Sequence, residues 1–120
     1  MESSSMKPQS AKNKGRKLQQ WVRNLILQFF HELEEDDVQS RSMGAGGEDI
    51  ILSPTARTKL PYAIEAKNQE RVNIWSAYDQ AEENSRGFIP AVVIKRNGHK
   101  PLVVMSAEDW ISRENWLQGS

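Results

Sequence analysis

The apolar residues in the first third of the chain recur at steps of three and four positions. They are Leu18, Trp21, Val22, Leu25, Ile26, Phe29 and Leu33. Residues at these steps share one face of an α-helix, so the spacing predicts an amphipathic helix over residues 14–35 with one face toward a core. A second helix is expected over residues 72–85, where Ile74, Trp75, Tyr78 and Ala81 are apolar or aromatic. We expect Trp21 and Trp75 to belong to the core.

Shorter apolar segments predict strands. Three are expected over residues 38–42, 49–52 and 62–67, with the stretch GAGG as a flexible turn after the first and Ser53-Pro54 as the end of the second. The stretch AVVIKRNGHKPLVVM predicts two more strands around a tight turn at Asn97-Gly98. Ser106 can then cap a last helix.

The expected order of elements, α-β-β-β-α-β-β-α, indicates an α/β (α+β) fold. A chain of 120 residues is enough for one domain, which we place at residues 14–117. Residues 1–13 are polar without apolar periodicity, so they are expected to form a disordered basic tail.

Composition excludes several classes of protein. The chain has no cysteine, which rules out disulfides, thiolate catalysis and cysteine-based zinc sites. No apolar run approaches the roughly 20 residues of a membrane span, and the N-terminus lacks the apolar segment of a signal peptide. We therefore expect a cytoplasmic protein without a membrane partner or a small-molecule substrate.

Charge is distributed unevenly although the net charge is zero. Within residues 1–24 the only anion is Glu2, whereas the cations there are Lys7, Lys12, Lys14, Arg16, Lys17 and Arg23. Acidic residues gather at 32–37. Any affinity for nucleic acid must therefore come from a local basic patch, and the cluster at residues 12–17 is the candidate.

Candidate chemistry lies in the second and third expected strands. Side chains two apart on a strand share a face, so Glu65 and Lys67 lie together, and Asp49 opens the preceding strand. Two carboxylates from neighbouring strands, with the backbone carbonyl of Ala66 as a third ligand, can hold Mg²⁺, for which Mn²⁺ can substitute. The cation could activate water against a phosphodiester, with Lys67 neutralising developing charge. The alternative is that these residues are ordinary strand-edge charges, because such a short pattern arises often by chance.

At these residues the sequence resembles a known family. GGEDIIL, IEAKN and DQAEE, preceded by Lys14-Gly15, resemble the signatures of the PD-(D/E)xK nuclease superfamily, and within it the archaeal- and phage-type Holliday junction resolvases. The resemblance spans roughly residues 14–106 and implies a restriction-endonuclease-like core with a mixed central sheet, extended here by a C-terminal strand and helix. It also implies Asp49 and Glu65 as metal ligands, Lys67 as the catalytic lysine and Gln80 as a supporting polar residue.

Two positions depart from the family pattern. Glu48 stands where the motif has proline, and Gln19 stands where resolvases carry a glutamate that contributes to the metal site. The second metal ion is thereby put in doubt. Glu48 is not expected to replace that ligand, because its side chain should point to the opposite face from Asp49.

The resulting expectation is a Mg²⁺-dependent DNA endonuclease, a resolvase-like homodimer. The alternatives are a nuclease that acts on nicked, flapped or replicating linear DNA, and a catalytically idle DNA-binding module of the same fold. Expected DNA contacts are Lys12, Lys14, Arg16, Lys17, Gln19 and Ser42. Trp110 and Trp116 in the last helix are candidates for a dimer interface.

Overall fold

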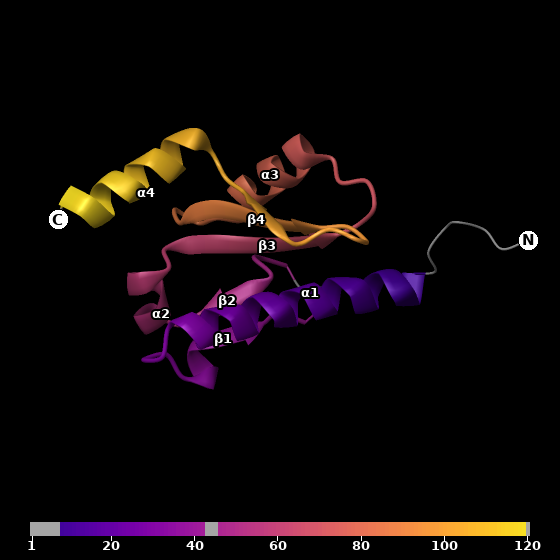
Figure 1. Ribbon diagram of the computed structural model, residues 1–120, viewed down its shortest axis with the longest axis horizontal. Coiled ribbons are helices and arrows are strands. Elements are labelled where there is room, and N and C mark those ends of the chain that lie inside the picture. The colour runs from indigo at the N-terminus through magenta and orange to yellow at the C-terminus, as the bar shows by residue number, and fades with distance from the viewer. Residues whose placement is uncertain (1–7, 43–45, 120) are drawn as a thin grey trace, which may run out of the picture.

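A computed structural model describes residues 8–42 and 46–119 (Figure 1). The helices are α1 (Pro8–Phe29), the 3-10 turn η1 (Glu35–Asp37), α2 (Pro54–Lys59), α3 (Ile74–Glu83) and α4 (Ala107–Gly119). The strands are β1 (Val38–Ser40), β2 (Ile50–Leu52), β3 (Tyr62–Asn68), β4 (Ile89–Lys95) and β5 (Leu102–Val104). Within the described ranges, every helix is too short or too polar to traverse a lipid bilayer.

The strands form one mixed sheet and one small antiparallel ladder. β3 runs parallel to β4 along its whole length, and β4 pairs antiparallel with β5, so the predicted mixed sheet and the turn at Asn97-Gly98 are confirmed. β1 and β2 pair antiparallel beside this sheet. The backbone N–H of Asp49 donates to the carbonyl of Ile64 at 2.8 Å, which joins the start of β2 to the middle of β3.

α1 and α3 cover opposite faces of the mixed sheet (Figure 1). α1 packs Leu18, Val22 and Ile26 against buried residues of β1, β2, β3 and β4. On the other face, Ala77 and Ala81 of α3 pack on Val92. The fold is therefore the predicted α+β arrangement, in which β3 is buried between two helical layers.

The first helix differs from the prediction at both ends. α1 begins at Pro8, so the expected disordered tail is wrong for residues 8–13, and residues 1–7 lie outside the described ranges. Proline suits a first turn because that turn leaves backbone N–H groups unused. α1 ends at Phe29 rather than at residue 35, because a turn closed by the bond from Leu33 N–H to the Phe30 carbonyl returns Leu33 to the core.

The helix α2 was not predicted. Ser53-Pro54 was interpreted as the end of a strand, but the Ser53 hydroxyl accepts a hydrogen bond from Ala56 N–H at 3.1 Å, and Pro54 takes the first helical position. Serine followed by proline is a helix start as well as a strand end. The short helix places Arg57 beside the start of β3.

The tryptophans predicted to be core residues are not buried. Trp75 is 81% exposed and Trp21 is 44% exposed. In α3 the close contact with the sheet is made by Ala77 and Ala81, and Trp75 lies two positions from Ala77, which is about 200° around the helix. Trp110 and Trp116 are also exposed, and no residue of α4 is buried.

Candidate active site

The candidate residues surround one open cavity of about 430 Å³. α1, the glycine turn before β2, the end of β3 and one face of α3 supply its walls. Its lining includes Gln19, Gly46, Gly47, Asp49, Glu65, Ala66, Lys67, Asn68, Gln80 and Asn84. The residues that the sequence predicted to be catalytic or metal-binding, Asp49, Glu65, Ala66, Lys67 and Gln80, are thus brought together.

Asp49 is fixed against β3 through its backbone and its side chain. Its N–H donates to the Ile64 carbonyl, and its Oδ2 accepts from Ala66 N–H at 2.7 Å. Burial raises the pKa of Asp49, while the Ala66 hydrogen bond and the charge of Lys67 act in the opposite direction. Asp49 also lines the cavity.

Glu65 is the most buried charged group in the cavity wall, with 4% of its surface exposed. Burial and the nearby charge of Asp49 raise the pKa of Glu65 to about 7, while a hydrogen bond with the Asn84 side chain and the charge of Lys67 lower it. Its Oε2 is buried without a hydrogen-bond partner among the described residues. A buried carboxylate oxygen with no donor is stabilised by a proton or by a cation.

The donor set suits a hard divalent cation. The N–H and C=O groups of one strand residue point to the same edge, so the Ala66 carbonyl faces the side where its N–H meets Asp49. Mg²⁺ is commonly held by one or two carboxylates and keeps several waters. Within the described residues no cluster of three or more metal-ligating side chains occurs, so the fit is to two carboxylates and one carbonyl.

Lys67 is oriented by Gln80. The Lys67 Nζ on β3 donates a hydrogen bond to Gln80 Oε1 on α3 at 3.2 Å. Lys67 shares its strand face with Glu65, as the alternation of β3 predicts. The ammonium therefore lies in the same cavity as the two carboxylates, and its hydrogen-bond partner Gln80 is neutral.

Two asparagines in the cavity wall were missed by the sequence analysis. Asn84 is the C-cap of α3 and interacts with Glu65. Asn68 donates from Nδ2 to the carbonyl of Lys14 at 3.1 Å, and its Oδ1 is buried without a partner among the described residues. Asn68 directly follows the Glu-x-Lys motif, which is a usable signal. Asn84 gives no such sequence signal, because asparagine is common at helix ends, where its side chain can bond to nearby backbone groups.

Gln19 lies in the cavity wall where the family pattern has a glutamate. It is 3% exposed, and its Oε1 accepts a hydrogen bond from the Ser40 hydroxyl at 2.5 Å. The side chain thus presents no charge to the cavity. Of the other expected DNA contacts, Lys12, Arg16, Lys17 and Ser42 are exposed, and Lys14 binds Asn97 and Glu70.

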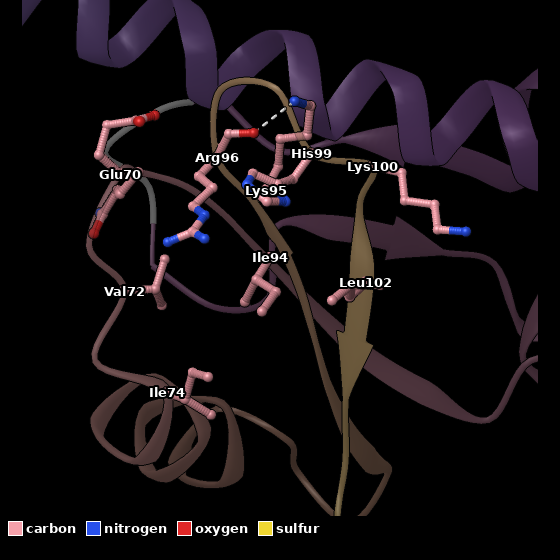
Figure 2. Close-up of a pocket in the computed structure, with 10 residues that line it drawn as sticks. Glu70, Val72, Ile74, Ile94, Lys95, Arg96, His99, Lys100 and Leu102 are labelled. Atoms are coloured by element: carbon pink, nitrogen blue, oxygen red, sulfur yellow. Dashed lines mark hydrogen bonds between the residues drawn. The ribbon is translucent and has the colours of Figure 1, made fainter.

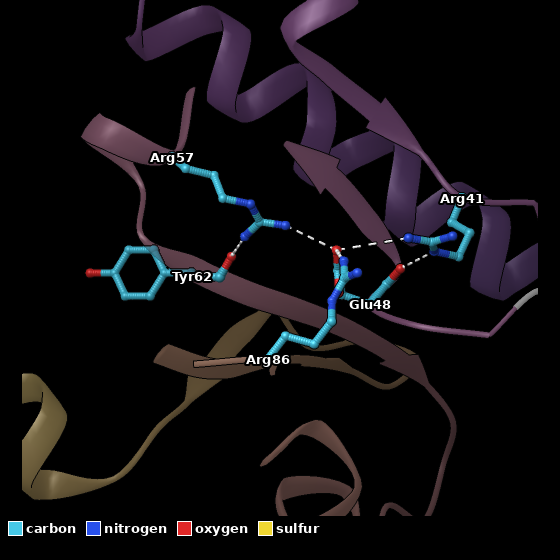
Figure 3. Close-up of polar contacts among 5 residues, drawn as sticks. All are labelled: Arg41, Glu48, Arg57, Tyr62 and Arg86. Atoms are coloured by element: carbon cyan, nitrogen blue, oxygen red, sulfur yellow. Dashed lines mark hydrogen bonds and ion pairs between the residues drawn. The ribbon is translucent and has the colours of Figure 1, made fainter. Parts of the chain in front are cut away.

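Glu48 points away from the cavity, as predicted, into a group of three arginines (Figure 3). Its Oε1 lies 2.9 Å from Arg57 Nη2, 3.1 Å from Arg86 Nη2 and 3.8 Å from Arg41 Nη2. Arg41 Nε also donates to the Glu48 carbonyl at 2.6 Å, and Arg57 Nη1 donates to the Tyr62 carbonyl at 2.9 Å. Glu48 therefore links the start of β2 to Arg57 of α2, to Arg41 just after β1 and to Arg86 between α3 and β4.

Replacing Glu48 with glutamine is expected to destabilise the fold. Glu48 is 1% exposed, and losing its charge leaves the mostly buried Arg57 without a counter-ion, a cost of about 2–3 kcal/mol. Urea unfolding measures the change in free energy. Glu32→Gln is the matched control, because Glu32 forms only an exposed pair with Lys59 at 3.9 Å, worth at most about 0.5 kcal/mol. Equal stability of the two variants would show that the arginine group does not hold this turn.

Comparison with protein-family models, with curated proteins and with solved structures finds no match to this chain. The resemblance to PD-(D/E)xK nucleases therefore rests on the short sequence motifs alone.

Proposed function

We propose that this protein is a Mg²⁺-dependent DNA endonuclease that hydrolyses phosphodiester bonds. The observation that carries the proposal is the convergence of Asp49, Glu65 and Lys67 on one open cavity. The unpartnered Glu65 Oε2 adds a group that a cation would satisfy. That Asp49, Glu65 and Lys67 are all present argues against a catalytically idle DNA-binding module of this fold.

Each residue of the cavity then has a chemical role. Asp49 Oδ1, Glu65 Oε2 and the Ala66 carbonyl would hold the cation, which when bound polarises the phosphodiester and acidifies a water molecule. Lys67, oriented by Gln80, donates to a phosphate oxygen or to the attacking water as negative charge develops. Gln19 brings no charge, which favours one metal ion over two.

The substrate class we propose is branched DNA, cut by a homodimer. A four-way junction presents equivalent strands, and a twofold dimer presents two equivalent sites. α4 has no buried residue yet carries exposed Trp110, Ile111, Trp116 and Leu117. Beside it, an apolar groove of about 350 Å³ lies between α1 and the sheet, with Trp21 and Val103 in its lining. A second copy of the chain, with its α4 on this groove, would cover both surfaces.

The expected result is a dimer that binds a four-way junction more tightly than a duplex of equal length. Light scattering measures the mass of the protein in solution. Competition binding in EDTA measures its preference for the junction over the duplex. Ile111→Arg should produce monomers and remove the preference for the junction, whereas Ser112→Arg, which adds the same charge to a polar position of α4, should not. A wild-type monomer that cuts linear and branched DNA at equal rates would eliminate the resolvase assignment and leave the general nuclease.

A further inference from the structure

The hairpin that joins β4 to β5 carries a second concentration of positive charge. Lys95, Arg96, His99 and Lys100 lie around its turn and line a cavity of about 260 Å³, together with Glu70 and apolar side chains (Figure 2). Within the described residues, none of these four forms an ion pair with a carboxylate. The charges of Lys95, Arg96 and Lys100 are therefore open to an outside anion.

The one acidic residue of this cavity is already engaged. Glu70 Oε2 accepts from Asn97 N–H at 2.8 Å and lies 3.6 Å from Lys14 Nζ. Lys14 in turn donates to Asn97 Oδ1 at 3.0 Å. Glu70 thus binds the hairpin turn to α1, and it forms no ion pair with Lys95, Arg96 or Lys100 among the described residues. The result is a basic loop held at its tip by side chains from two other segments.

The hairpin lies next to the candidate active site. Gln69 lines both the active-site cavity and the hairpin cavity, and its N–H donates to the Lys95 carbonyl at 3.0 Å. Asn68, in the active-site wall, pairs with Lys95 in the β3–β4 register. A polyanion that enters the active-site cavity and extends past Gln69 therefore meets the hairpin.

We propose that the β4–β5 hairpin, residues 95–100, is a contact surface for the DNA backbone beside the bond that is cut. This inference rests on the proposed nuclease function. Lysine and arginine side chains gathered around one turn suit neighbouring phosphates, which are recognised by charge and position without regard to base sequence. The hairpin would hold the DNA backbone next to the active site together with the cations of α1 at residues 12–17, of which Lys14 contacts Asn97 in the hairpin turn.

The salt dependence of binding tests the hairpin separately from catalysis. Binding of a fluorescent duplex is measured in EDTA, so that no cleavage occurs, over a series of salt concentrations. The triple variant Lys95→Gln, Arg96→Gln and Lys100→Gln should lower the slope of log affinity against log salt by about 2 to 3, because each lost phosphate contact removes about 0.9. At saturating DNA its cleavage rate should stay within about twofold of wild type, since it keeps Asp49, Glu65 and Lys67.

Single variants supply a matched control. Lys100→Gln should lower the slope by about 0.9, whereas Lys59→Gln should leave it unchanged. The Lys59 substitution removes the same charge close to the start of β3, whereas the hairpin lies at the other end of that strand. An unchanged slope in the triple variant, with wild-type thermal stability and metal-dependent cleavage intact, would overturn the hairpin proposal alone. If the triple variant has a reduced slope but the wild-type protein cleaves no DNA, the hairpin is supported as a DNA contact and the nuclease function is contradicted.

Discussion

Glu65→Gln is expected to lower the rate of DNA cleavage by about a thousandfold or more. A bound cation contributes several kcal/mol to stabilising the transition state, and 4 kcal/mol corresponds to about three powers of ten in rate. Glutamine keeps the size of Glu65 but removes the charge that holds the cation. Asp49→Asn should have a comparable effect, because Asp49 and Glu65 face the same cavity.

The fold should survive the Glu65 substitution. Burial already makes the charged form of Glu65 unfavourable, so a neutral side chain of the same shape fits the site without a metal. Thermal unfolding in EDTA should therefore give a midpoint at or above that of the wild type. Glu83→Gln, an exposed position on α3 outside the cavity, is the activity control. Wild-type cleavage by Glu65→Gln would remove the carboxylate from the mechanism.

Lys67→Ala is the second substitution with a large expected effect. Loss of a cation directed at developing charge typically costs about 10²–10³ in turnover, so kcat should fall by that factor. DNA affinity in EDTA should change by no more than about threefold, because Lys67 is one cation among many phosphate contacts. Single-turnover cleavage at saturating DNA measures the first quantity, and the binding titration measures the second.

The hairpin variants provide the contrast for Lys67. They should weaken binding and spare turnover, whereas Lys67→Ala should spare binding and reduce turnover. Gln80→Ala should fall between the wild type and Lys67→Ala, since it removes the group that orients the ammonium and leaves the charge in place. A Lys67→Ala protein that binds weakly but cleaves at the wild-type rate would reassign Lys67 to a plain phosphate contact.

The sequence predicted the strands and the cavity residues well because strand alternation is a local rule. Glu65 and Lys67 had to share a face of β3, and Glu48 had to point away from Asp49, and the structure confirms both. Asp49 was expected close to β3 because the two strands follow each other in the chain, and its bond to Ala66 N–H places it there. Local pattern was therefore sufficient to predict that Asp49, Glu65 and Lys67 lie together.

What the sequence did not predict depends on contacts between distant segments. Trp75 is exposed because the small Ala77 and Ala81 determine which face of α3 meets the sheet. The three arginines around Glu48 come from positions 41, 57 and 86, and no spacing rule links them. Asn84 reaches Glu65 only because α3 packs over β3, so its place in the cavity follows from tertiary structure.

We propose that Asp49 and Glu65 hold a divalent cation that the protein needs to cleave DNA. Metal-dependent cleavage by the wild-type protein tests this most directly. A synthetic four-way junction and a plasmid are incubated with the purified protein in EDTA, then with excess Mg²⁺, with Glu65→Gln purified in parallel. We predict no cleavage in EDTA, cleavage when Mg²⁺ is supplied, and none by the variant. Cleavage in EDTA, equal cleavage by the variant, or no cleavage of either DNA with Mg²⁺ or Mn²⁺ would contradict the proposed function.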